Sequence, residues 1–340
     1  MPPVVCAAPP VKIGGQAVIE GVMMKAPHAY ALAMRNTLTG GIEVRTFPTP
    51  VRGKRGPRAW PFVRGVFELF GLLWVGMKTL MISADFAVAN EEAAKARGTG
   101  AESAPAENDH AGGDAGPAPR ATVRGKKPAK KGISNWEAGI TITAAMAFAI
   151  VLFVLLPLGF TEWLHRSLPL NNLGYNAVDG VFRVLIFLGY LGVIGFIPDI
   201  RRVFAYHGAE HKSIHAYEHG LPLTVEATRA YGTAHRRCGT NFLFIVIVIS
   251  IVVFALAAGE GWAWKILSRI VLLPVIVGVS YEILKLADKL GTIGGIIAAP
   301  GMWLQRLTTR VPDDAQVEVA LAALKAVAET APAAVEATIP

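Results

Sequence analysis

Residues 138–160, AGITITAAMAFAIVLFVLLPLGF, contain no charged side chain and decide the fold class of this 340-residue chain. At about 1.5 Å rise per residue, a helix of this length crosses a hydrocarbon core of about 30 Å. Three further apolar stretches follow, at about 177–198, 240–259 and 264–286. We therefore predict an all-α polytopic membrane protein with about four transmembrane helices.

The composition supports the same class. Apolar residues make up 53% of the chain and charged residues only 17%, whereas a soluble domain has about 25% charged residues. The only two cysteines, Cys6 and Cys238, are too far apart in sequence to form a disulfide framework. The net charge of +8 suits loops that face anionic lipid, so the expected partner is the lipid bilayer and not nucleic acid. The sequence does not identify a protein partner.

The distribution of positive charge predicts the orientation. Residues 1–135 hold 18 of the 33 Lys and Arg, and residues 200–239 hold six. The loops between the predicted spans, 161–176 and 260–263, hold one Arg and none. By the positive-inside rule, both termini and the 200–239 loop of this multi-pass protein are expected to be cytoplasmic.

Two regions precede the spans. Residues 1–60 are expected to hold a Gly-rich motif and a β-hairpin over 29–48, which form a small cytoplasmic α+β cap with the 200–239 loop. Basic segments flank residues 61–88 on both sides, so a helix there is expected to lie in the interface or fold against the bundle. Whether 62–84 spans the membrane stays open at this stage.

The remaining regions follow from composition. Between Val88 and Ile133 there is no Ile, Leu, Met, Phe, Trp or Tyr, which predicts a disordered linker over 89–134 whose basic end contacts anionic lipid. The four spans and the 200–239 loop occupy residues 135–290. Within 291–340, the stretch 291–304 is too short to cross and holds Gly and Pro, which predicts a re-entrant or interfacial segment. A C-terminal cytoplasmic helix should run from Asp313 to about Glu329, with Gln316 at the capping-box position.

Five of the eight histidines fall between residues 207 and 235. On a helix over 207–219, the α-helical period places His207, His211, His215 and Glu218 on one face. Around the helix axis, His215 lies farther from His207 than His211 does. Histidines at i and i+4 point to one place and can share a metal ion. His207, Glu210 and His211 also spell H-x-x-E-H, the inverted zincin order in which two His bind zinc and the Glu activates water.

Further candidate ligands follow this helix. His235 and Cys238, with two residues between them, precede a predicted span. Two interpretations of Glu20 in GGQAVIEGVMMKAP stay open: it completes a metal shell or orients a histidine, or it is the exposed Glu of a packed turn. A site closed by His207, His211, His235 and Cys238 would be structural, whereas an open position beside a free Glu210 would be catalytic. The alternative is an interfacial His-rich helix followed by a basic patch that contacts lipid phosphate.

Five separated motifs carry a resemblance: GGQAVIEGVMMKAP, YHGAEHKSIHAYE, HRRCGTNF, YEILK and PGMWLQRLTTRVPDDAQVEVA. With them the chain resembles the YqhQ-like family of bacterial integral membrane proteins, a domain of unknown function. The resemblance implies a predicted metal-dependent enzyme and no particular substrate. The family usually has His-Pro-Arg-Cys where this chain has His235, Arg236, Arg237 and Cys238, so the ligand types remain while the rigid proline turn is lost.

The sequence thus predicts a divalent metal, with zinc the expected ion, bound at the cytoplasmic membrane surface by His207 and His211 with His235 or Cys238. Glu210 is the expected general base of a metal-dependent hydrolase. Two alternatives stay open: a membrane scaffold whose metal or His cluster is structural, and a transporter or channel for a small solute or metal ion.

Overall fold

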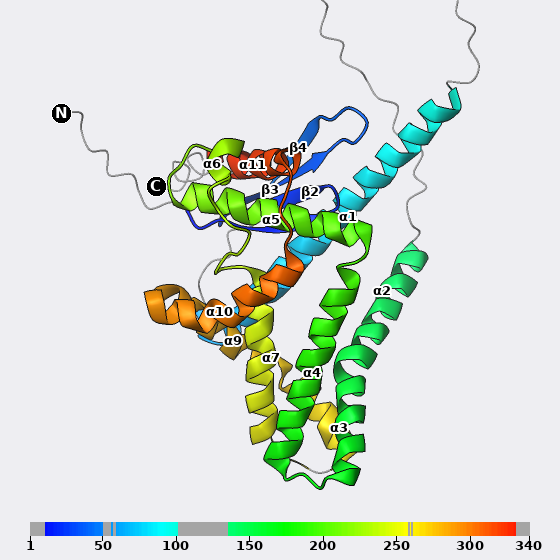
Figure 1. Cartoon of the computed structure of the whole chain (residues 1–340), viewed down its shortest axis with the longest axis vertical. Coiled ribbons are helices and arrows are strands. Elements are labelled where there is room, and N and C mark those ends of the chain that lie inside the picture. The colour runs from blue at the N-terminus through cyan, green and yellow to red at the C-terminus, as the bar shows by residue number, and fades with distance from the viewer. Residues whose placement is uncertain are drawn as a thin grey trace, which may run out of the picture.

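The computed structural model describes residues 11–49, 56, 59–100, 135–257, 259 and 261–330. It is mostly helical, with one small sheet (Figure 1). The strands are β1 (Gly14–Val18), β2 (Gly21–Lys25), β3 (Ala29–Arg35) and β4 (Ile42–Pro48), and they form an antiparallel meander in the order β1-β2-β3-β4. The hairpin predicted over 29–48 is confirmed by pairs such as Ala33 with Val44. The β1-β2 hairpin was not predicted.

The helices begin and end as follows: α1 (Val63–Gly100), α2 (Asn135–Ile150), a π-helical turn (Val151–Leu155), α3 (Leu156–Ser167), α4 (Asn172–Ile194), α5 (Pro198–Glu218), α6 (Val225–Thr228), α7 (Gly239–Leu256), α8 (Trp262–Val271), α9 (Leu273–Lys289), α10 (Gly291–Thr308) and α11 (Asp314–Glu329). α11 begins at the predicted capping box, in which the Asp313 carboxylate accepts from the Gln316 amide at 2.7 Å. The predicted C-terminal helix is therefore confirmed.

Helices cover both faces of the sheet (Figure 1). Side chains alternate along β3, so Ala31 and Ala33 face α5 and α11 while Leu32 and Met34 face α1. Val75, Ile82 and Phe86 of α1 pack on this second face. The N-terminal strands, α5 and α11 therefore share one core, as expected for a cap that combines the N-terminus with the 200–239 loop.

Within the described residues, four helices are long and apolar enough to cross a membrane: Val63–Arg97, Gly139–Ser167, Asn172–Ile194 and Gly239–Leu256. The last three correspond to predicted spans. The predicted span at 264–286 is instead divided into α8 and α9, which meet at a bend of 43°. Pro274 lies in the first turn of α9. A proline has no backbone N–H, so it cannot donate the hydrogen bond that would continue α8 into α9.

The expected disordered linker needs correction in its first part. Residues 89–100, expected as disordered linker, continue α1 to Gly100, because this stretch is rich in Ala and Glu and carries the Glu91–Lys95 ion pair one turn apart. Residues 101–134, with the basic end of that linker, lie outside the described residues. The segment 291–304, predicted to be re-entrant or interfacial, is part of α10, which continues through Pro300. Glycine allows this helix to pack closely on α7, because a Cβ on Gly301 would lie 2.4 Å from Asn241 Oδ1.

Candidate metal centre

The histidine-rich segment forms one long helix, α5, beside the sheet (Figure 1). Pro198 and Asp199 occupy its first turn, where a missing N–H is harmless and a negative charge is favourable, and Gly220 follows its end with φ +67°. His207 and His211 lie one turn apart on this helix with ring centroids 4.4 Å apart. The predicted common face of these two histidines is therefore present.

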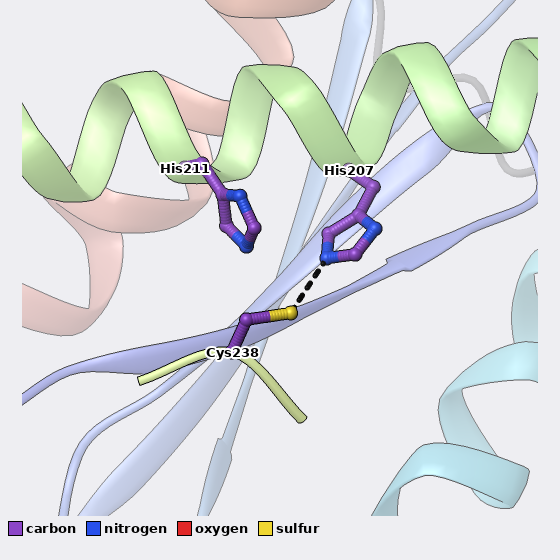
Figure 2. A group of neighbouring side chains, drawn as sticks. All are labelled: His207, His211 and Cys238. Carbon is purple, nitrogen blue, oxygen red and sulfur yellow. Dashed lines mark hydrogen bonds between the residues drawn. The ribbon is translucent and has the colours of Figure 1, made fainter. Parts of the chain in front are cut away.

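Cys238, the N-cap residue of α7, faces the same two rings (Figure 2). Its Sγ lies 3.2 Å from His207 Nε2 and accepts a hydrogen bond from the Thr240 amide at 3.4 Å. The three ligand atoms of His207, His211 and Cys238 all lie within 4.8 Å of one another. Two imidazoles and a thiol at these separations form a donor set that could hold a metal ion.

Backbone carbonyls orient both imidazole rings. His207 Nδ1 donates to the Thr308 carbonyl at 2.9 Å, and His211 Nδ1 donates to the Thr233 carbonyl at 2.5 Å. A carbonyl oxygen only accepts, so each Nδ1 carries the proton and each Nε2 offers its lone pair toward the sulfur. This is the arrangement of metal-binding histidines, whose second nitrogen is held by a carbonyl or carboxylate. His211 Nε2 is buried and has no hydrogen-bond partner.

The environment of the group favours its metal-binding protonation states. Burial lowers the pKa of His211 and keeps the ring neutral. Neutral imidazole is the form that binds metal.

Glu210 is buried beside this group, between α5 and β1. Burial raises the pKa of its carboxyl to about 8, while nearby His207 and a hydrogen bond from the Gly15 backbone oppose that shift. A Cβ on Gly15 would lie 2.8 Å from three atoms of the Glu210 side chain, so only glycine permits this approach. Glu210 Oε2 is buried and has no hydrogen-bond partner in the part of the chain that the structure describes.

A second group, comprising His215, Glu218 and His235, lies next to the first. His235 Nε2 donates to Glu218 Oε2 at 3.3 Å, and its Nδ1 accepts from the Arg237 amide at 3.3 Å. Burial also lowers the pKa of His235 to about 4. Both ring nitrogens of His235 are therefore engaged, and the structure places this predicted ligand beside the His207–His211–Cys238 group and not in it.

The predicted metal-binding or histidine-orienting role of Glu20 is wrong. Its carboxylate accepts two hydrogen bonds from Arg202, each 2.6 Å long, and one from the Tyr206 hydroxyl at 3.2 Å. Glu20 lies in the β1-β2 turn with φ +51°, where it ties the turn to the N-terminal half of α5. The sequence pattern did not distinguish this ion pair from a metal contact.

Gln305 is a positioning residue that sequence reasoning missed. This fully buried side chain of α10 accepts from the His235 amide at 2.8 Å and donates to the His235 carbonyl at 2.9 Å. It also donates to Asn241 in the first turn of α7. Gln305 therefore fixes the segment that presents Cys238. The only available signal was a polar residue in the apolar motif PGMWLQRL.

Comparisons with known proteins support the family resemblance. The family model described as "Protein of unknown function (DUF1385)" matches residues 60–330. The chain is 32% identical over 316 residues to "Uncharacterized protein YqhQ" of Bacillus subtilis (strain 168), and the alignment covers 92% of this chain and 91% of that protein. No solved structure gives a significant match. The chain therefore belongs to the YqhQ-like family, whose shared domain is described as DUF1385.

Proposed function

We propose that this protein is an integral membrane protein that binds a divalent metal, with zinc the expected ion, at the junction of its apolar bundle and its sheet. The observation that carries the proposal is the pair of Nδ1-to-carbonyl hydrogen bonds that point the Nε2 atoms of His207 and His211 toward Cys238. A structural His cluster needs no such lone pair. A buried, unpartnered His211 Nε2 is costly unless something binds it.

The membrane assignment rests on α2 to α4 and α7, which are long and apolar enough to span. α1 passes the same test by composition, but its residues Val75 to Phe86 pack against the sheet. A helix that covers a face of the sheet does not cross the bilayer at that point. α1 therefore lies along the membrane surface, with exposed apolar side chains such as Phe70 and Trp74 directed to lipid.

In this arrangement the metal site faces the cytoplasm. The sheet, α5 and α11 lie on one side of the bundle, and α5 carries Arg201, Arg202 and Lys212 of the basic 200–239 segment to that side. The positive-inside rule places that side in the cytoplasm of a bacterial inner membrane. Anionic headgroups are the expected neighbours of this surface.

We assign the site to metal-dependent hydrolysis. Three protein ligands leave a fourth position of a tetrahedral shell open, as in catalytic zinc sites, and the bound ion would acidify a water there. Glu210 comes from the same helix and has an unpartnered buried oxygen. A bound cation would lower the raised pKa of the Glu210 carboxyl, and the resulting carboxylate would take the proton of that water as the general base. His207, His211 and Cys238 hold the ion, and His235 and Gln305 position the Cys238 segment.

The test compares Glu210→Gln with the wild-type protein, each purified in detergent and loaded with zinc. Zinc content and the unfolding midpoint should be unchanged, because Glu210 is not a ligand. Hydrolysis of a panel of p-nitrophenyl esters, phosphates and fluorogenic peptides should fall by about 100-fold or more for whichever probe the wild type cleaves. If the wild type binds zinc and Glu210→Gln complements a deletion strain fully, the site is structural and the protein is a scaffold.

A further inference from the structure

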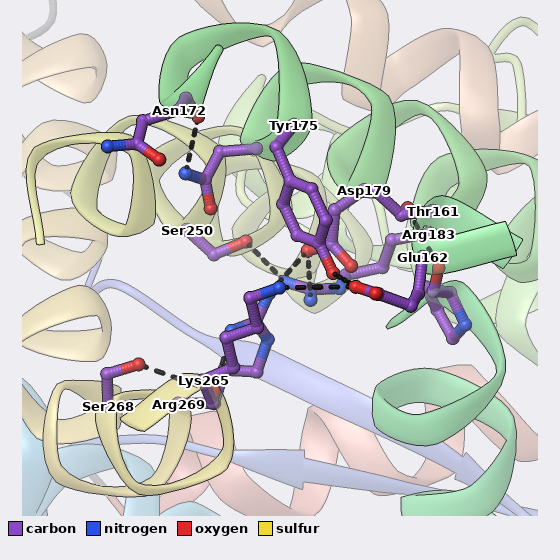
Figure 3. Close-up of polar contacts among 12 residues, drawn as sticks. Thr161, Glu162, Asn172, Tyr175, Asp179, Arg183, Ser250, Lys265, Ser268 and Arg269 are labelled. Atoms are coloured by element: carbon purple, nitrogen blue, oxygen red, sulfur yellow. Dashed lines mark hydrogen bonds and ion pairs between the residues drawn. The ribbon is translucent and has the colours of Figure 1, made fainter. Parts of the chain in front are cut away.

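A second polar site lies at the opposite end of the bundle from the sheet, where α3, α4, α7 and α8 meet (Figure 3). Asp179 of α4 is 2% exposed and accepts 2.9 Å hydrogen bonds from both Arg183 and Arg269. Those two side chains are only 11% and 6% exposed. One buried carboxylate is therefore shared by two buried guanidinium groups.

A lysine adds to this charge. Lys265 of α8 lies 3.3 Å from Glu162 of α3 and 4.0 Å from the centroid of the Tyr175 ring. The cluster therefore holds three cations, Arg183, Arg269 and Lys265, against the two carboxylates of Asp179 and Glu162. These buried and partly buried groups carry a net charge of +1 among apolar helices, where an uncompensated charge is costly. Arg166 lies 4.0 Å from Glu162, but its side chain is exposed to solvent and is not counted among them.

A cavity of about 320 Å³ lies beside the cluster. Its lining includes Tyr175, Lys265, Ser268 and Arg269, so it presents two cations and two hydroxyl groups. Among the described residues, the buried Arg269 Nε and Arg183 Nε have no hydrogen-bond partner, and neither has the buried acceptor Asp179 Oδ1. The two unused donors outnumber the unused acceptor, and together with the net charge they indicate an oxyanion as the missing partner, because arginine recognises oxyanions in a fork geometry.

We propose that this cavity binds a singly charged phosphodiester group. A single negative charge matches the net +1 of the cluster, and the cavity volume lies in the range of small-ligand sites. The lining also includes Leu170, Gly259 and Gly261, which join the helices at this end of the bundle. With the membrane insertion proposed above, this end lies at headgroup depth, so a lipid phosphodiester of the leaflet away from the sheet is the expected source.

The test uses the full-length protein in detergent and follows its thermal unfolding midpoint. Dioctanoyl phosphatidylglycerol should raise the midpoint in a saturable manner, whereas dioctanoylglycerol, which lacks the phosphate, should not. Lys265→Gln should weaken the apparent affinity about tenfold, and Lys265→Arg should largely retain it. Arg166→Gln is the matched control, because this exposed side chain lies at the same end of the bundle but does not line the cavity.

The soluble headgroup glycerophosphoglycerol separates the two sources. Saturable stabilisation by the headgroup alone indicates a soluble phosphodiester, and stabilisation only by the intact lipid indicates a membrane lipid; either result supports the site. No saturable shift in the wild type, or equal losses in Lys265→Gln and Arg166→Gln, would overturn it. The affinity should be unchanged in His207→Ala, so this result does not depend on the metal site.

Discussion

Gly15→Ala tests the contact that places Glu210 beside the metal centre. The added methyl would lie 2.8 Å from Cγ, Cδ and Oε1 of Glu210, well inside van der Waals contact. Forcing an extra methyl into a packed site costs about 1 to 3 kcal/mol. Gly14→Ala is the matched control, since a Cβ at this neighbouring glycine of β1 has nothing within 4 Å, and its cost should be within about 0.5 kcal/mol.

The double variant isolates the contact. Glu210→Ala removes the three atoms that the new methyl meets, so Gly15→Ala should cost about 1 to 3 kcal/mol less in that background. The assay is chemical denaturation in detergent micelles, followed by far-UV circular dichroism, for the wild type, both single variants and the double variant. Equal costs of Gly15→Ala in the two backgrounds would refute the claim that Glu210 lies against Gly15.

Three further predictions concern the surrounding fold. Burial holds the pKa of folded His235 at about 4, below the 6.5 of the unfolded chain, so at this residue only the unfolded state gains a proton as pH falls between these values. This histidine should lower the unfolding free energy by up to about 3 kcal/mol, and His235→Gln should reduce the pH dependence of denaturation curves by that share; the buried His211 and His215 account for the remainder. Gly208→Ala should cost about 1 to 3 kcal/mol and reduce metal content, because its Cβ would lie 2.1 Å from the Arg310 carbonyl oxygen; unchanged denaturation and metal content would contradict this. Asp313→Ala should lower the unfolding free energy by about 0.5 to 2 kcal/mol, because it removes the capping box of α11. Asp314→Ala removes only an exposed ion pair and should lower it by under about 1 kcal/mol in the same denaturation assay; equal losses would contradict the role of the cap.

Local patterns predicted several elements correctly. The alternation around residues 29–48, the cap at Asp313 and three apolar runs each predict an element from residues that are close in sequence. The helical spacing of His207 and His211 likewise placed both rings on one face before the partner was known. Such features depend on backbone periodicity, which is readable in a single sequence.

The parts that were missed depend on contacts distant in sequence. The β1-β2 hairpin has short strands with glycines that pack against α5, and α1 continues past residue 88 with one face against the sheet. The choice of Cys238 and not His235 as the third member of the group follows from Glu218 and Arg237, which occupy both His235 ring nitrogens. The carbonyls of Thr233 and Thr308 that orient the histidines are main-chain atoms, which leave no mark in residue identity.

Metal analysis of the purified protein tests the central claim most directly. Wild-type protein purified without chelator and equilibrated with zinc should hold about one ion per chain, and His207→Ala, His211→Ala and Cys238→Ala should each lose most of it, since each removes one of three ligands. His215→Ala is the matched control, because this histidine of the same helix donates its Nε2 proton to the Ala234 carbonyl and lies outside the His207–His211–Cys238 group; it should retain most of the metal. Folded wild-type protein that binds no divalent metal, or equal losses in all four variants, would contradict the account.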